Sequence, residues 1–135
     1  DERKNYFYNI LSGIKNETEM LWLIIHKKDK KAIGTIRLHY WDLYRKKTQI
    51  GYGISPNYGK KGYFSEALLT IINYTFEKLK FYRIEAWTRW DNIGSIKGLE
   101  KIGFLYEGKL REYQLAYDNE RYDIVIYSIL KRDLL

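Results

Sequence analysis

The chain contains no cysteine in its 135 residues, and only one proline and two histidines. Disulfides and cysteine nucleophiles are therefore excluded within it, and the histidines offer little material for a zinc site, so we expect no metal. A chain without disulfides fits a reducing compartment, and we expect a cytoplasmic location. No apolar run approaches the roughly 18–20 residues of a membrane-spanning helix. The longest strongly apolar run is Met20–Ile25, so we expect no membrane partner.

The chain is rich in basic residues, with 24 Lys and Arg against 17 Asp and Glu, a net charge of +7. Such a charge favours an anionic partner, such as nucleic acid, a membrane surface or a phosphorylated ligand. Short basic clusters occur at Lys27–Lys31, Arg45–Lys47 and Lys60–Lys61. The first two are typical of hairpin tips kept soluble by lysine. They form no continuous stripe and no recognition motif, which argues against nucleic acid as the partner.

Hydrophobic periodicity predicts strands first and then alternating strands and helices. Strands are expected at Glu19–His26, Ala32–Trp41, Thr48–Ser55, Arg83–Arg89, Phe104–Tyr117 and Arg121–Leu130. Helices are expected at Asp1–Gly13, Ser65–Lys80 and Asn92–Ile102. This order predicts an α+β fold, with a central mixed and mostly antiparallel sheet, one parallel step and flanking helices.

The stretch Pro56–Ala67, PNYGKKGYFSEA, holds the only proline and two of the ten glycines directly before the longest expected helix. The first N–H groups of a helix lack intrahelical partners, and glycine lets a ligand approach them closely. A pyrophosphate is the natural occupant of such a site. The stretch has neither the Gly-Lys-Ser/Thr of a Walker loop nor the third glycine of a dinucleotide fingerprint. On its own it is equally well interpreted as a turn that caps a helix.

A second stretch, Asp91–Phe104, reads DNIGSIKGLEKIGF. Together with Pro56–Leu68 it resembles the GNAT superfamily of acetyl-CoA-dependent N-acetyltransferases. The first stretch is similar to the family's pyrophosphate loop, and the second to its Asn-x-x-Ser…Glu-Lys-x-Gly-Phe segment. Gly103–Tyr113 and Tyr122–Leu130 resemble the branch that contains ribosomal-protein N-terminal acetyltransferases. The resemblance runs in the family's order from Glu19 to Leu130.

The resemblance implies a single acetyltransferase domain over residues 1–135, in which Asp1–Gly13 is similar to the family's second helix. The family's usual first strand and helix would then be missing or degenerate. The strands at Thr48–Ser55 and Arg83–Arg89 would splay apart and hold the pantetheine arm of acetyl-CoA. The implied cofactor-binding residues are Ile54, Gly59, Lys60, Lys61, Gly62, Tyr63, Phe64, Ser65, Asn92 and Ser95. For Asn92, a helix N-cap is an equally good interpretation.

The reaction implied by the resemblance is direct attack of a neutral primary amine on the acetyl thioester. The acceptor would be a protein N-terminus or a small amine, such as a polyamine, an aminoglycoside-like drug or an amino sugar, and the assembly a monomer or a homodimer. A non-catalytic acyl-CoA-binding or sensing module is the alternative. It is favoured by Gln49, where many members carry an acid, and by Leu99, where many carry a tyrosine.

These departures leave Ser95 or a water to protonate the thiolate. Glu85 is the first candidate for the base, and ordinary strand alternation fits it equally well as a solvated or paired strand residue. Glu112, His39 and Asp91 are further candidates, each of which also fits a surface or capping role. Phe64 is a third departure, since glycine or alanine is usual there, and Gly59 a fourth, since arginine or glutamine is common. The side chain of Phe64 would either narrow the approach to the phosphate or point into the core.

Overall fold

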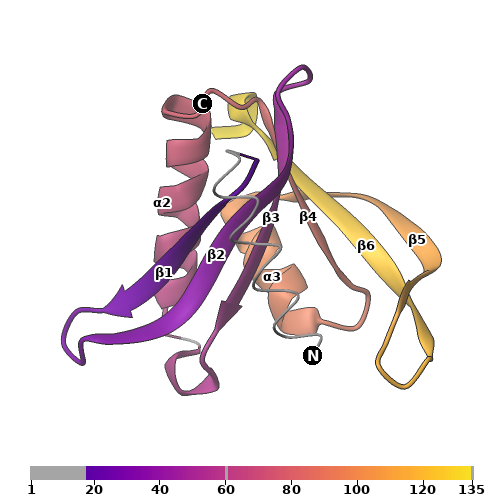
Figure 1. The fold of residues 1–135 in the computed structure, drawn as a ribbon, viewed down its shortest axis with the longest axis horizontal. Helices are drawn as coiled ribbons and strands as arrows, with labels where there is room; N and C mark the ends of the chain where they lie inside the picture. The colour runs from indigo at the N-terminus through magenta and orange to yellow at the C-terminus, as the bar shows by residue number, and fades with distance from the viewer. Residues whose placement is uncertain (1–17, 60, 135) are drawn as a thin grey trace.

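The computed structural model describes residues 18–59 and 61–134, and its described part contains one six-stranded sheet (Figure 1). The strands are β1 (Met20–His26), β2 (Lys31–Asp42), β3 (Lys47–Ile54), β4 (Arg83–Arg89), β5 (Leu105–Leu115) and β6 (Arg121–Leu130). Their order is β1-β2-β3-β4-β6-β5, parallel between β3 and β4 and antiparallel at every other pair. The predicted α+β fold with a mixed, mostly antiparallel sheet is confirmed. The helix expected at Asp1–Gly13 lies outside the described residues.

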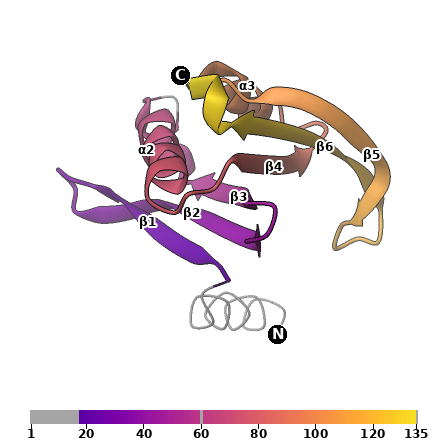
Figure 2. The ribbon, with the colours of Figure 1, turned by 90° about the horizontal axis from the view of Figure 1, so that it is seen from above.

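Two α-helices, α2 (Tyr63–Glu77) and α3 (Ile93–Ile102), lie on the same face of the sheet (Figure 2). Short 3-10 helices, η1 (Pro56–Tyr58) and η2 (Lys131–Leu134), follow β3 and β6. Helix α2 begins and ends earlier than the predicted Ser65–Lys80. It begins earlier because Gly62 takes a left-handed conformation, with φ of 82°, directly before Tyr63. None of the helices in residues 18–59 and 61–134 is long and apolar enough to span a bilayer.

The core lies between this face of the sheet and the two helices. Alternate positions of the strands point toward the helices, as the period of a strand requires. The fully buried side chains on this face include Ile36, Leu38, Ile84 and Ile129 from the sheet and Leu68, Ile72, Phe76 and Leu99 from the helices. The resemblance places Leu99 where many members of the similar family carry a tyrosine, and its full burial shows that this position belongs to the core.

Strands β3 and β4 are paired over only three positions. The partners are Lys47 with Arg83, Thr48 with Ile84, and Gln49 with Glu85. Beyond them β3 continues to its end against β2, and β4 continues to its end against β6. The carboxyl halves of the two strands therefore diverge (Figure 1). We call the space between residues 50–54 and 86–89 the strand wedge; it confirms the predicted splay.

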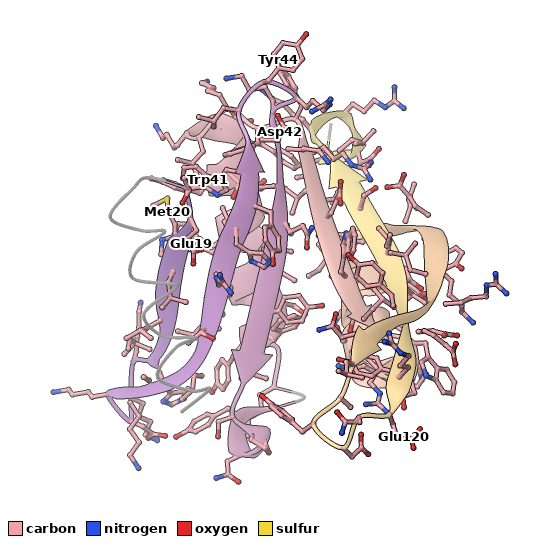
Figure 3. All side chains as sticks on the ribbon, turned by 45° about the vertical axis from the view of Figure 1, so that its right-hand side comes forward. Glu19, Met20, Trp41, Asp42, Tyr44 and Glu120 are labelled. Atoms are coloured by element: carbon pink, nitrogen blue, oxygen red, sulfur yellow. The ribbon has the colours of Figure 1, made fainter. Side chains whose placement is uncertain are left out.

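The ends of the sheet are set by its turns. Figure 3 places Tyr44, in the turn between β2 and β3, at one end of the molecule and Glu120, in the turn between β5 and β6, at the other. The wedge opens away from the end that carries Tyr44, because β3 and β4 pair only at their amino-terminal ends, and β3 begins directly after that turn. Asp42 closes the first of these turns through its carboxylate, which accepts from the Arg45 amide at 2.8 Å.

His39 lies on β2, on the face of the sheet away from α2 and α3, and pairs with Gln49. Its Nδ1 is buried and has no hydrogen-bond partner, and its ring lies 3.2 Å from the position a Cβ would take at Gly51. Burial and the nearby charge of Arg37 lower the pKa of His39 from 6.5 to about 4. The neutral imidazole is therefore the form that the folded protein favours.

We expect His39→Gln to reduce the loss of stability on acidification. Between pH 6.5 and about 4 the unfolded chain binds a proton at His39 that the folded chain does not. The contribution of His39 to the unfolding free energy is therefore fully present above pH 6.5. It is lost as the pH falls from 6.5 through 4. Over that interval the wild type should lose about 2 kcal/mol more unfolding free energy than the variant, after allowance for solvent screening of a part-exposed ring. Urea unfolding at both ends of the interval measures this; parallel pH profiles would contradict it.

Candidate functional site

The loop between β3 and α2 exposes the amino-terminal end of a helix. Gly62 is the N-cap of α2 and, among the described residues, no side chain caps the first turn. The amides at the start of α2 consequently have no intrahelical acceptor, and the helix dipole places partial positive charge there. Glu66 N–H is the first to bond within the helix, to the Gly62 carbonyl at 3.0 Å. The amides of residues 62–65 can therefore bind an anion.

The remaining loop residues have different surroundings. Gly59 is extended, with φ of −67°, and its amide donates to the Pro56 carbonyl at 3.3 Å, so that amide is already engaged. Lys61 is exposed, with its Nζ 5.8 Å from the centre of the Tyr58 ring. Lys60 lies outside the described residues. The predicted contacts of these three residues with a cofactor stay predictions.

The Phe64 side chain points into the interface between helices and sheet. Its ring centre lies 4.7 Å from that of Tyr52 on β3. On its other side it reaches Gly98 of α3, where an added Cβ would lie 3.2 Å from Phe64 Cε1. The bulk of Phe64 is accommodated inside the protein because α3 has a glycine opposite it. Only the Phe64 backbone is thus left to face a ligand at the α2 amino terminus.

The same interface contains two neighbouring hydroxyl groups, of which the sequence predicted one. The Tyr52 hydroxyl and Ser95 Oγ are 2.6 Å apart, joining β3 to the first turn of α3. Burial raises the pKa of Tyr52 to about 12, against a smaller opposing effect of the Ser95 hydrogen bond. The phenol is therefore protonated at neutral pH. Ser95 was predicted; Tyr52 was not, although its place on the helix-facing side of β3 follows from strand alternation.

Asn92 is the N-cap of α3, since its Oδ1 accepts from the Ser95 amide at 3.2 Å. The capping interpretation of the Asn-x-x-Ser spacing is therefore confirmed. The cap fixes the first turn of α3 and with it the Ser95 hydroxyl beside Tyr52. Contact of Asn92 or Ser95 with a cofactor stays a prediction, as does contact at Ile54, which ends β3 at the mouth of the wedge.

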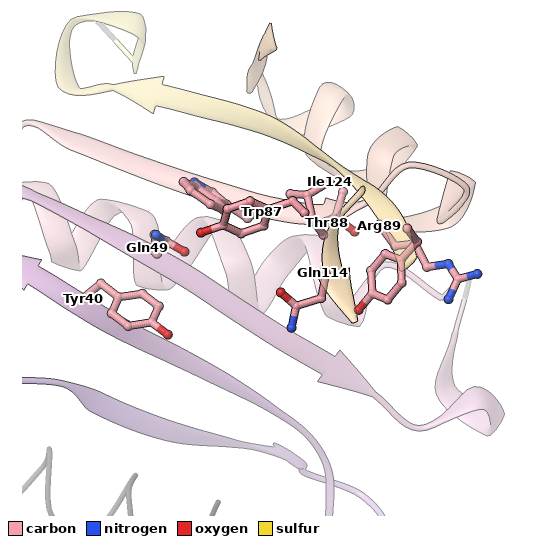
Figure 4. A pocket seen from close by; sticks show the side chains of 9 residues that line it. Tyr40, Gln49, Trp87, Thr88, Arg89, Gln114 and Ile124 are labelled. Carbon is pink, nitrogen blue, oxygen red and sulfur yellow. The ribbon is translucent and has the colours of Figure 1, made fainter. Parts of the chain in front are cut away.

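A cleft of about 640 Å³ lies on the face of the sheet opposite α2 and α3 (Figure 4). It is lined by Tyr40, Gln49, Trp87, Thr88, Arg89, Tyr113, Gln114, Tyr122 and Ile124. Gln49 belongs to the last parallel pair of β3 with β4, and Trp87 follows just beyond it on β4. The cleft therefore opens at the point where the two strands separate.

The far wall of the cleft depends on an irregularity in β5. The pairing of β5 with β6 shifts between Leu110 and Gln114, and Glu112 within this bulge has φ of 48°. Asp123 Oδ1 accepts from the Glu112 amide at 2.7 Å and holds the bulge in place. The bulge turns Tyr113 toward Trp87, with ring centres 5.6 Å apart in an edge arrangement. Bulges commonly re-aim side chains next to binding sites in this way.

Glu85, the first base candidate, is buried in a network of hydrogen bonds and charges. Its carboxylate accepts from Arg83 Nε at 3.0 Å and from Trp87 Nε1 at 2.9 Å, and Lys47 Nζ is 3.7 Å away. Burial works to raise the pKa of Glu85, but the bonds from Trp87 and Arg83 outweigh it and lower the pKa below the ordinary value. The carboxylate is held in its ionised form and orients the Trp87 indole.

The other base candidates are dispersed. Asp91 accepts from Arg89 Nε at 2.7 Å at the exposed end of β4. Glu112 is exposed on the β5 bulge and does not line the cleft, whereas its neighbours Tyr113 and Gln114 do. His39 lies beside Gln49 with its Nδ1 enclosed. Within residues 18–59 and 61–134 no three acidic or histidine side chains gather into a group that could hold a metal ion.

Comparison with known proteins identifies the family. The model of the acetyltransferase (GNAT) domain matches residues 1–105. An uncharacterized N-acetyltransferase, p20 of Bacillus licheniformis, is 37% identical over 110 residues, which are 82% of this chain and 61% of that protein. The ribosomal-protein-serine acetyltransferase of Escherichia coli (strain K12) is 26% identical over 125 residues, which are 93% of this chain and 67% of that protein.

A crystal structure of a probable acetyltransferase superposes with a TM-score of 0.85 at 30% identity, and the match covers 97% of this chain and 72% of that one. The chain spans less than two thirds of the length of the Bacillus relative. The match to the family model extends over most of the chain and includes the loop before α2, the wedge and the start of α3. The chain belongs to the GNAT acetyltransferase family.

Proposed function

We propose that the protein is an N-acetyltransferase that transfers the acetyl group of acetyl-CoA to a primary amine. The observation that carries the proposal is the strand wedge. It lies between an uncapped helix amino terminus on the helical side and an aromatic cleft on the other face of the sheet. One face can thus receive an acyl donor and the other an acceptor, and the two meet where β3 and β4 part.

On the donor side, the chain offers backbone groups rather than side chains. The edge of β3 beyond Gln49 has no strand partner on the β4 side among the described residues, so its backbone near Ile54 can bind the pantetheine amides as an added strand would. The amides of residues 62–65 suit the pyrophosphate. Acetyl-CoA, when bound, supplies the acetyl group as a thioester. A backbone N–H near Ile54 is also the candidate donor to the oxygen on which negative charge develops.

On the acceptor side, the cleft suits an amine with a single positive charge. The rings of Tyr40, Trp87 and Tyr113 can attract one ammonium group through their faces, whereas the Tyr122 ring already has the Arg89 guanidinium 4.5 Å from its centre. No carboxylate is among the nine lining residues. Three carboxylates beside the cleft already have cationic partners: Asp91 has Arg89 at 2.7 Å, Asp123 has Lys109 at 3.9 Å, and Glu85 has Arg83 at 3.0 Å. We infer that a peptide N-terminus is a better acceptor than a polyamine.

Within this scheme, Ser95 and Tyr52 provide the hydrogen-bond donor for the departing thiolate. Both hydroxyls are protonated at neutral pH and lie under the wedge. Glu85 acts by fixing Trp87 in the cleft wall rather than as a base, because its carboxylate is engaged by three donors. Removal of the proton from the acceptor ammonium is then left to water in the open cleft.

The variant Gly62→Val should abolish the thermal stabilisation by acetyl-CoA. A β-branched residue in the left-handed region costs about 1–2 kcal/mol and distorts the α2 amino terminus. At 100 times its dissociation constant, acetyl-CoA should stabilise the wild type by about 2.7 kcal/mol in thermal melts. Gly108→Val on β5 is the matched control, since Gly108 is not in the left-handed region and has open space beside it. An unchanged shift in Gly62→Val would show that the cofactor binds elsewhere.

Release of free thiol from acetyl-CoA should be faster with a peptide N-terminus than with spermidine. We expect kcat/KM to differ by roughly tenfold or more. The additional positive charges of spermidine would be repelled by Arg89 and would meet no carboxylate among the lining residues. A thiol-trapping assay with both amines measures the ratio. Preference for spermidine would refute the acceptor assignment. Binding of acetyl-CoA without turnover on any amine would favour the non-catalytic sensing module instead.

Ser95→Ala should lower kcat by about 100-fold while the KM for acetyl-CoA changes little, because the hydroxyl contributes only as charge develops on sulfur. Tyr52→Phe should lower kcat by a similar factor. If the two hydroxyls act as one unit, the double variant should be no slower than the slower single variant. Multiplicative losses would show that the residues act independently, and unaltered kcat in Ser95→Ala would exclude its role.

A further inference from the structure

The turn between β1 and β2 is fastened to the loop that precedes α2. We call residues 27–31 the hairpin tip. Tyr58, at the end of η1, donates from its hydroxyl to Asp29 Oδ2 at 2.7 Å. His26, directly before the tip, has its Nε2 3.0 Å from the hydroxyl of Tyr63, the first residue of α2. Both elements lie at the same end of the molecule (Figure 1).

The geometry of this contact is specific. The Asp29 amide donates to His26 Nδ1 at 3.0 Å, so the neutral imidazole carries its proton on Nε2 and donates to Tyr63. The His26 ring packs against the rings of Tyr58 and Tyr63, each with a centre-to-centre distance of 5.1 Å. Because side-chain bonds and ring contacts act together, the tip has a defined position relative to the α2 amino terminus.

The contact gathers positive charge beside that amino terminus. Lys27, Lys28, Lys30 and Lys31 of the tip are exposed, as is Lys61 of the loop. Among the described residues none of these five lysines forms an ion pair.

Asp29 is the single acidic residue in the tip. The hydrogen bond from Tyr58 lowers the pKa of Asp29, against an opposing effect of burial, and the charges of Lys31 and Lys61, with that of His26 when the ring is protonated, lower it further. Its carboxylate is thus already engaged by the Tyr58 hydroxyl. The excess of lysines over this one carboxylate leaves the patch able to bind a multiply charged anion.

We propose that the hairpin tip binds the 3′-phosphate of the CoA moiety. This inference depends on the proposed function, in which the pyrophosphate occupies the start of α2. Coenzyme A carries one further phosphate, a monoester on the ribose with close to two negative charges at neutral pH. The ribose follows the pyrophosphate directly, so the monoester lies within one nucleotide of the amides of residues 62–65. The tip lysines are the concentrated cationic group that Tyr58 and Tyr63 hold next to those amides.

The test compares acetyl-CoA with its 3′-dephospho form, using isothermal titration calorimetry on the wild type and on the variant Lys27→Gln/Lys28→Gln/Lys30→Gln. We expect the wild type to bind acetyl-CoA roughly tenfold more tightly than the dephospho form, the scale of a few part-exposed ion pairs. In the variant the two affinities should become equal, through weaker binding of acetyl-CoA alone. The preference of the wild type should also shrink at high salt.

A matched control removes three positive charges from the opposite end of the molecule, with Lys46→Gln/Lys78→Gln/Lys80→Gln. It should keep the wild-type preference. The inference is overturned if the wild type binds both nucleotides equally, or if the tip variant weakens both by the same factor. If Lys97→Gln on α3 removes the preference and the tip variant does not, the 3′-phosphate lies on the other side of the loop. Failure of the wild type to bind either nucleotide would overturn the proposed function itself.

A second variant tests the position of the tip without changing its charge. Tyr58→Phe removes the hydroxyl that holds Asp29 and keeps the ring beside His26. We expect it to lower the preference for acetyl-CoA over the dephospho form to a value between those of the wild type and the triple variant. A preference equal to that of the wild type would show that this hydrogen bond has no part in placing the lysines.

Discussion

The arrangement of this protein depends on where the parallel pairing of β3 and β4 stops. Three residue pairs join the strands, and each strand then follows a different antiparallel neighbour. Because a strand edge without a partner has free backbone donors and acceptors, this separation makes a place where an extended ligand can bind through its own amides. The loop before α2, the first turn of α3 and the cleft all adjoin this one place, on the two faces of the sheet.

The two faces of the sheet differ in what they offer. On the helical face, Phe64 and Tyr52 fill the space below the wedge, and Gly98 makes room for the Phe64 ring. This packing leaves the Tyr52 and Ser95 hydroxyls at the inner end of the wedge. On the opposite face, the β5 bulge brings Tyr113 over Trp87, whose indole is held by Glu85. The carboxylate is thus used to build the wall of the cleft.

Charge is distributed to match this division. Glu85, Asp91 and Asp123 near the cleft are each engaged by a cationic side chain, whereas the lysines of the hairpin tip have no ionic partner among the described residues. Paired surface charges contribute little to stability, and unpaired ones of a single sign attract an anion. The net charge of +7 is therefore unevenly distributed. Much of the excess positive charge lies beside the amino terminus of α2.

The sequence by itself determined the order of strands and helices and the family, because periodicity and motif spacing are local properties of the chain; the splayed pair was expected only through the family resemblance. It also placed Asn92 correctly as a possible cap, since capping involves residues only three positions apart. Only the tertiary structure decided which way Phe64 points, that Tyr52 meets Ser95, and that the lysines at residues 27–31, interpreted from sequence as a solubility feature, lie against the loop before α2. These contacts join residues about 10 to 45 positions apart, and their geometry is fixed by how the strands and helices pack, which no local pattern specifies.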